Sequence, residues 1–102
     1  MRRVRYSTTF IRQLDTLLAQ GEPKFGERLI DEKRDLVFDT IDDFLARFPK
    51  KQLDLDIGLY THPITGTPFV VIYDFDDTEL RVFFIVHSHT DRTGINADDV
   101  EW

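Results

Sequence analysis

The most constraining stretch of this sequence is residues 68–89, which read PFVVIYDFDDTELRVFFIVHSH. Two apolar runs, at residues 69–73 and 80–86, lie on either side of the acidic segment 76–79. Runs this short and this rich in β-branched and aromatic residues are typical of strands, and the segment between them has the composition of a turn. The stretch therefore predicts a β-hairpin.

The charges next to the turn select the register of this hairpin. If Phe75 lies opposite Leu80, Asp74 lies opposite Arg81, which is a favourable cross-strand pair. A shift of the pairing by two residues would place Asp74 opposite Glu79, and two like charges would then face each other. The first register is therefore predicted.

This register divides the hairpin into two faces, because side chains alternate along a strand. The first face is predicted to carry Phe69, Val71, Tyr73, Phe75, Leu80, Val82, Phe84 and Val86. The second face is predicted to carry Val70, Ile72, Phe83 and Ile85, with Asp74 and Arg81 at the turn and His87 at the far end. A sheet with one wet side shows polar residues at alternate positions, and this hairpin does not. Both faces must therefore be covered.

The first half of the chain predicts helices that cover one face. Residues 3–6 alternate charged and larger side chains, as in a short strand. Residues 7–9 offer N-caps for a helix whose apolar positions recur at helical spacing until Gly21. A second helix is predicted from about Pro23 to Phe48, where Pro49 stops it. The short connection between the helices predicts an antiparallel pair.

The second half adds strands to the hairpin. Alternating leucine and isoleucine residues predict one strand over residues 53–59, and residues 62–67 predict a turn. Residues 90–101 are polar and are expected to fray unless Ile95 or Trp102 holds them to the body. The order β-α-α-β-β-β predicts one α+β domain over residues 1–102, a small antiparallel sheet packed on an α-helical hairpin. Phe44 and Phe84 are predicted to lie buried between the second helix and the sheet.

Composition and charge narrow the class of protein. The chain has no cysteine, so disulfides and thiolate chemistry are excluded, and neither a signal peptide nor a transmembrane run is visible. A cytoplasmic protein is therefore expected. Residues 1–51 carry a net charge of +2 and residues 52–102 a net charge of −8, so the hairpin half is a poor partner for phosphates.

Several short motifs, at or near the ends of the predicted helices and strands, resemble those of a known family. Phe48-Pro49 closes the second helix, residues 69–73 lie where a Tyr-x-Val-x-Tyr-like strand is expected, and residues 80–86 lead into a His-x-x-x-Asp ending at His87 to Asp91. In order and spacing these pieces resemble the RelE/ParE superfamily of type II toxin–antitoxin toxins over about residues 3–92. The resemblance implies a toxin silenced by an antitoxin encoded beside it, a small DNA-binding protein that is ParD-like.

The resemblance implies one of two targets, DNA gyrase for ParE-like members or ribosome-bound mRNA for RelE-like members. RelE-type sites are strongly basic, whereas the sheet half here offers only Arg81 and Arg92, and Phe69 and Val70 stand where nucleases of the family often have an arginine. The departure favours a ParE-like toxin that binds a protein target, without cofactor or catalytic residue. The alternatives are an endoribonuclease that uses Arg81, His87, His89 and Arg92, or a degenerate member that only binds its antitoxin.

Binding residues are predicted on the second face and at the end of its strand. The second face has no predicted cover from its own chain, and a free monomer seldom exposes a large apolar patch. The antitoxin or the target is therefore expected to contact Val70, Ile72, Phe83, Ile85, His87, His89 and Arg92. A metal site at His87, His89 and Asp91 is not predicted, because a strand-end histidine more often caps backbone groups.

Overall fold

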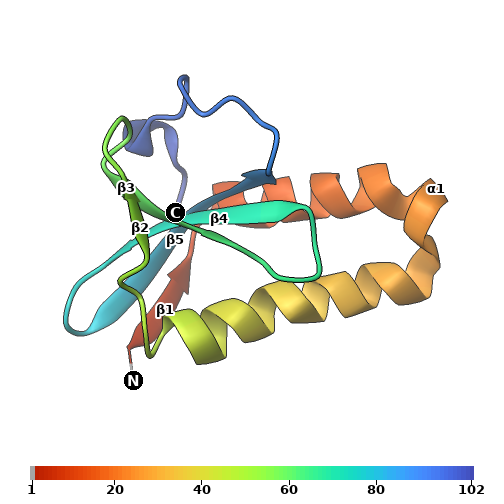
Figure 1. Cartoon of the computed structure of the whole chain (residues 1–102), viewed down its shortest axis with the longest axis horizontal. Coiled ribbons are helices and arrows are strands. Elements are labelled where there is room, and N and C mark those ends of the chain that lie inside the picture. The colour runs from red at the N-terminus through yellow and green to blue at the C-terminus, as the bar shows by residue number, and fades with distance from the viewer. Residues whose placement is uncertain (1) are drawn as a thin grey trace.

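A computed structural model describes residues 2–102, with the backbone alone for residues 22–25. A five-stranded sheet packs against two antiparallel limbs of one long helix, and the C-terminal segment returns to the sheet (Figure 1). The elements in chain order are β1 (Arg3–Tyr6), α1 (Thr8–Asp39), a π-helical segment (Thr40–Leu45), β2 (Gln52–Asp54), β3 (Leu59–Pro63), β4 (Phe69–Phe75), β5 (Glu79–His87) and a 3₁₀ turn (Ala97–Asp99).

The helical hairpin is present, but its turn lies later than predicted. Ser7 caps the start of α1, because its Oγ accepts a hydrogen bond from the Phe10 amide at 2.8 Å. The helix then continues through Gly21 and breaks at Gly26, which has φ 70° and ψ 166°. A positive φ is accessible to glycine at little cost, so Gly26 rather than Gly21 reverses the chain.

The second limb ends in a π-helical segment that changes which side chains face the core. Ile41 and Leu45 are fully buried, whereas Phe44 is 42% exposed. A π-helix places more residues in each turn than an α-helix, so the helical spacing read from the sequence no longer holds. The prediction that Phe44 is buried under the sheet is therefore wrong.

The sheet has the strand order β1-β5-β4-β3-β2. The α+β class and the packing of the sheet on a helical pair are confirmed, but the sheet is mixed, because β1 runs parallel to β5 while the other neighbours are antiparallel. The strand predicted over residues 53–59 is two strands. The chain turns between them, with a hydrogen bond from Gly58 N to Asp54 O at 2.8 Å, and Leu55 is 85% exposed. The following turn begins only after Pro63.

The hairpin of β4 and β5 has the predicted register next to its turn and a different one beyond it. Asp74 pairs with Arg81, and Phe75 with Leu80, as the charges predicted. Farther along, Tyr73 pairs with Val82 while its neighbour Ile72 pairs with Phe84, which leaves Phe83 as an extra residue in β5. This β-bulge shifts the alternation of every later side chain.

The bulge reverses the predicted faces of the end of β5. Phe84 packs with Ile72 on the second face, although it was predicted under the helices, and Val86 packs there too. Ile85 joins Val71 in the helix-side core, where the sequence placed it on the opposite face. The helix-side core consists of Phe10, Leu14, Leu18, Val37, Ile41, Leu45, Ile64, Phe69, Val71, Tyr73, Leu80, Val82 and Ile85.

The second face is covered by the chain itself, so the prediction that it lies open is wrong. Ile95, Ala97 and Val100 of the C-terminal segment, residues 95–102, pack on its buried residues. Trp102 lies edge-on to Phe83, with ring centroids 4.9 Å apart. The expectation that the tail frays is therefore wrong for residues 95–102, which Ile95 and Trp102 hold to the sheet.

The C-terminal segment is also tied to the start of α1. The Glu101 carbonyl accepts hydrogen bonds from the amides of Thr8 and Thr9 at 2.7 and 3.3 Å. The Glu101 amide donates to Thr9 Oγ1 at 2.9 Å, and its carboxylate lies 2.8 Å from Arg12. The first amides of a helix have no partner within the helix, and here the end of the chain supplies one.

Candidate functional site

The charged and histidine residues predicted for function lie at, or just beyond, the two ends of β5. Arg81 and His87 are six residues apart in one strand, which separates their Cα atoms by about 20 Å at ~3.3 Å per residue. His89 and Arg92 follow β5 at its far end. The structure therefore does not bring the four residues of the ribonuclease alternative into one site.

Arg81 is held by three carboxylates at the turn between β4 and β5. Its Nε donates to Asp74 Oδ1 at 2.6 Å, and its Nη1 donates to Asp76 Oδ2 at 2.9 Å and to Glu79 Oε1 at 3.2 Å. The hydrogen bond from Arg81, together with those from the Thr78 and Glu79 amides, lowers the pKa of Asp76 well below its usual range. The same carboxylates raise the pKa of Arg81. Arg81 is thus a structural cation, as its pairing with Asp74 predicted.

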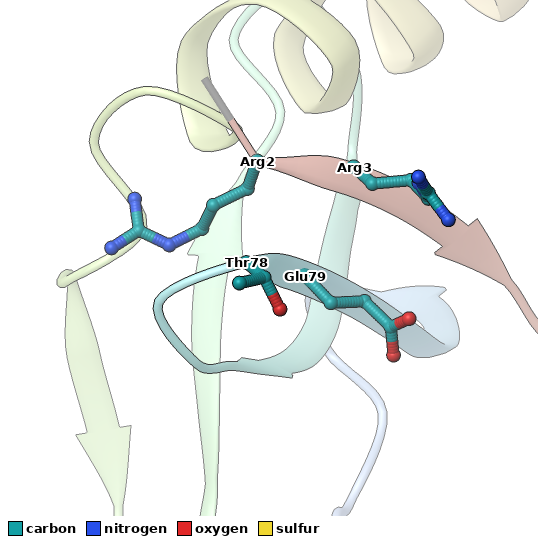
Figure 2. Close-up of a pocket in the computed structure, with 4 residues that line it drawn as sticks. All are labelled: Arg2, Arg3, Thr78 and Glu79. Carbon is teal, nitrogen blue, oxygen red and sulfur yellow. The ribbon is translucent and has the colours of Figure 1, made fainter.

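A hollow of about 520 Å³ lies beside this turn and is lined by Arg2, Arg3, Thr78 and Glu79 (Figure 2). The two arginine side chains extend in opposite directions along the hollow, so they do not converge on one point. Arg2 Nε donates to the Asp76 carbonyl at 2.6 Å, and its guanidinium lies 5.2 Å from the centre of the Phe75 ring. These contacts hold β1 against the turn.

His87 and His89 meet at the other end of β5. Their ring centroids are 5.2 Å apart, and the His89 amide donates to His87 Nδ1 at 3.2 Å. The Nδ1 atom is therefore the acceptor, and the ring caps a backbone amide, as the sequence favoured. Arg92 lies beyond this pair, with its Nε 3.6 Å from Asp54 Oδ2. Among the side chains that the structure describes, which exclude those of residues 22–25, no group of three histidine, aspartate or glutamate residues is placed to hold a metal ion.

The four apolar residues predicted to bind a partner are buried. Val70 and Phe83 are 7% and 8% exposed, and Ile72 and Ile85 are almost completely buried. Ile72 and Phe83 are covered by the C-terminal segment, while Ile85 belongs to the helix-side core. A partner could reach Ile72 and Phe83 only if residues 95–102 moved away.

Two surface features have no counterpart in the sequence predictions. The first is a groove of about 450 Å³ between α1 and the end of β5. The second is an exposed aromatic surface, where Phe44 lies 5.9 Å from Phe48 and 5.6 Å from His62 between ring centroids. Lys51 Nζ lies 4.1 Å from the centre of the Phe44 ring, and burial together with Lys51 lowers the pKa of His62.

The sequence contained one signal for the groove and none for the aromatic surface. The first strand segment is four residues long and the final apolar run of the hairpin is longer, so a pairing of the two, once known, leaves part of β5 without this neighbour. The aromatic surface depends on the π-helical segment, which helical spacing does not reveal.

Comparisons with protein-family models, with curated proteins and with solved structures find no match for this chain. The helices among the described residues include none that combines the length and the apolar character needed to cross a membrane.

Proposed function

We propose that this chain is the toxin of a type II toxin–antitoxin module, which inhibits growth by binding DNA gyrase and is neutralised by a cognate, ParD-like antitoxin. The proposal rests first on the residues that resemble the RelE/ParE superfamily. It rests second on the order of elements in this chain, which is a strand, two helical limbs and then a run of strands.

The ion pairs of Arg81 favour a binding mechanism over a catalytic one. Cleavage of a phosphodiester needs positive charge that is free to stabilise the charge on the transferring phosphoryl group. Arg81 already donates to three carboxylates of its own chain, and Arg92 faces Asp54. An incoming phosphate would have to displace these carboxylates and would also meet the net charge of −8 on residues 52–102.

The test measures growth and two biochemical activities of the same preparation. Induced expression is expected to stop growth, and co-expression of the protein encoded by the neighbouring reading frame is expected to restore it. The purified chain should inhibit supercoiling by gyrase and cause cleaved DNA to accumulate. Topoisomerase I is the control enzyme and should be unaffected.

Two results would contradict the proposal. Codon-spaced cuts in translated mRNA, with gyrase unaffected, would replace it with the ribonuclease alternative. If the folded chain inhibits neither growth nor gyrase, the remaining alternative is a protein that only binds its antitoxin.

A further inference from the structure

The end of β5 extends beyond the strand that should pair with it. β1 pairs with β5 only from Glu79 to Val82, and the chain then turns into α1 at Ser7. β5 continues for five more residues, to His87. Within residues 2–102, no strand lies beside these residues on the side away from β4.

The pairing with β4 fixes which backbone groups face this side. The Ser88 amide donates to the Pro68 carbonyl at 2.8 Å, and hydrogen-bonded pairs of an antiparallel ladder occur at every second residue. Phe84 and Val86 therefore form the hydrogen-bonded pairs with β4. The amide and carbonyl of Ile85 and the amide of His87 point the other way, toward α1, while the His87 carbonyl accepts a hydrogen bond from the Thr90 amide at 2.9 Å.

Two side chains near the start of α1 occupy part of this edge. Ser7 Oγ donates to the Phe83 carbonyl at 2.7 Å, and Gln13 Oε1 accepts from the Ile85 amide at 2.9 Å. These are the bonds that a neighbouring strand would otherwise make. The Ile85 carbonyl and the His87 amide are the next groups of the edge, and nothing in the described part of the chain bonds to them.

The groove of about 450 Å³ lies directly along these groups. Its volume is in the range of sites that bind small ligands or short peptide segments. Leu17, Ile85 and Val86 provide its apolar wall. Its remaining lining consists of Thr9, Arg12, Gln13, Thr16, Gln20, His87 and Thr90.

We propose that this groove binds an extended segment of a partner protein, which pairs with the edge of β5 at Ile85 and His87. Main-chain donors and acceptors along one wall recognise a peptide backbone. Side chains of the added strand would alternate between the two faces of the sheet, so one set would meet Leu17 on the helix side and the other set would meet Val86 on the second face. Gln13 holds the Ile85 amide until the incoming strand replaces it. The proposal does not depend on the toxin function or on gyrase.

The chemistry of the groove favours a peptide over a nucleic acid. Arg12 is its one permanently charged side chain, and the guanidinium is paired with Glu101 at 2.8 Å. Phosphate binding depends on free Lys and Arg side chains, whereas strand addition depends on the backbone groups that this edge presents.

The experiment uses a peptide selected from a random ten-residue library against the full chain. Amide hydrogen exchange at His87 is expected to slow when this peptide is added. N-methylation of its backbone at alternate residues should weaken binding about tenfold in one alternation and little in the other, because only one set of amides faces β5. Gln13→Ala should bind the peptide at least as tightly as the natural chain.

Matched variants locate the site. Leu17→Glu should weaken binding at least about tenfold, as should Thr16→Arg, an exposed position that serves if Leu17→Glu does not fold. Leu29→Glu, on the other limb of α1 and 43% exposed, should bind normally. The proposal is overturned if no peptide is enriched, if neither groove variant weakens binding, if both alternations of N-methylation are tolerated, or if single-stranded dT15 displaces the peptide.

Discussion

The two faces of the sheet are covered in different ways. The helix-side face packs on both limbs of α1, and its central residues Tyr73, Leu80 and Val82 have no exposed surface. The second face packs on residues 95–102, and Phe83 and Phe84 there keep 8% and 6% of their surface exposed. The same two strands, β4 and β5, supply both faces, so the difference lies in the cover.

The difference indicates which part of the fold can unfold locally at a low free energy. The helical cover consists of the two limbs of α1 on either side of Gly26 and contributes its own large core side chains. The C-terminal cover is a short segment with three small or partly buried apolar side chains, a few hydrogen bonds, one ion pair, one aromatic contact and one cation–π contact. Regions with few buried apolar contacts open at free energies far below that of global unfolding.

The largest effect is expected from the helix-side face. Phe10 is fully buried and packs against Tyr6 and Phe38, with ring centroids 5.3 and 6.1 Å away. Phe10→Ala should lower the free energy of unfolding by about 3–5 kcal/mol, because it removes buried surface and leaves a cavity. Ile11→Ala, at the next residue and 40% exposed, is the control and should cost less than about 1 kcal/mol.

Urea unfolding followed by circular dichroism measures both variants. Equal costs for Phe10→Ala and Ile11→Ala would contradict the assignment of Phe10 to the main core.

The next effect concerns the second cover. Truncation of the chain after Gly94 should lower the free energy of unfolding by about 2 kcal/mol. The loss is small because the stabilisation from apolar burial by this segment is largely offset by the entropy of ordering it. The fold should persist, and the uncovered Ile72, Phe83 and Phe84 should bind the dye ANS. A loss of unfolding free energy as large as that of Phe10→Ala would mean that the C-terminal cover stabilises the fold as much as the helix-side core does.

The sequence predicts those parts of the fold that local chemistry decides. Asp74 and Arg81 select the register at the turn, because the wrong pairing would place like charges together. The helical hairpin follows from apolar spacing, although glycine alone does not say which of Gly21 and Gly26 reverses the chain. The resulting α+β class needs no long-range information.

The sequence does not predict what one inserted residue or one distant contact decides. The bulge at Phe83 reverses the faces of Phe84, Ile85 and Val86, and nothing in an unbroken apolar run marks its position. The C-terminal cover was missed because its apolar residues are sparse and lie among polar ones. The groove was missed because it depends on where β1 ends relative to β5.

A smaller effect on stability is expected from the hydrogen bond of Tyr73, which is a polar contact within the helix-side face. The Tyr73 hydroxyl donates to the Pro49 carbonyl at 2.6 Å, and Tyr73→Phe should cost about 1 kcal/mol. Burial, and then the nearby Tyr60, raise the pKa of Tyr73. A raised pKa gives stability that is complete below the usual tyrosine pKa of about 10 and is lost as the pH rises above it.

The pH dependence provides the check for this anchor. The natural chain should lose stability above about pH 10 more steeply than Tyr73→Phe, in which this group cannot ionise. Tyr6 also has a raised pKa, from burial and then from its hydrogen bond to Asp42, so part of the alkaline loss should remain in the variant. Identical alkaline curves would show that Tyr73 is not the titrating anchor.

The smallest effect tests the outer edge of the C-terminal cover. The Arg5 guanidinium lies 4.6 Å from the centre of the Trp102 ring, which is 42% exposed. A cation–π contact at an exposed site is worth about 0.5–1 kcal/mol. Arg5→Gln alone would not isolate this contact, because Arg5 is also the neighbour of Arg81 in the parallel ladder, and removing one positive charge there could offset the loss.

A double-mutant cycle of Arg5→Gln and Trp102→Leu removes this complication, because the effect on Arg81 is the same with either residue at position 102 and cancels. The coupling energy should be about 0.5 kcal/mol and should change little with salt if the ring, rather than a distant carboxylate, is the partner of Arg5. Trp102 is the single tryptophan of the chain, so its fluorescence reports the same contact independently. A coupling energy of zero with unchanged fluorescence in Arg5→Gln would mean that Phe83 alone holds Trp102, and that the cover ends at β5 rather than at β1.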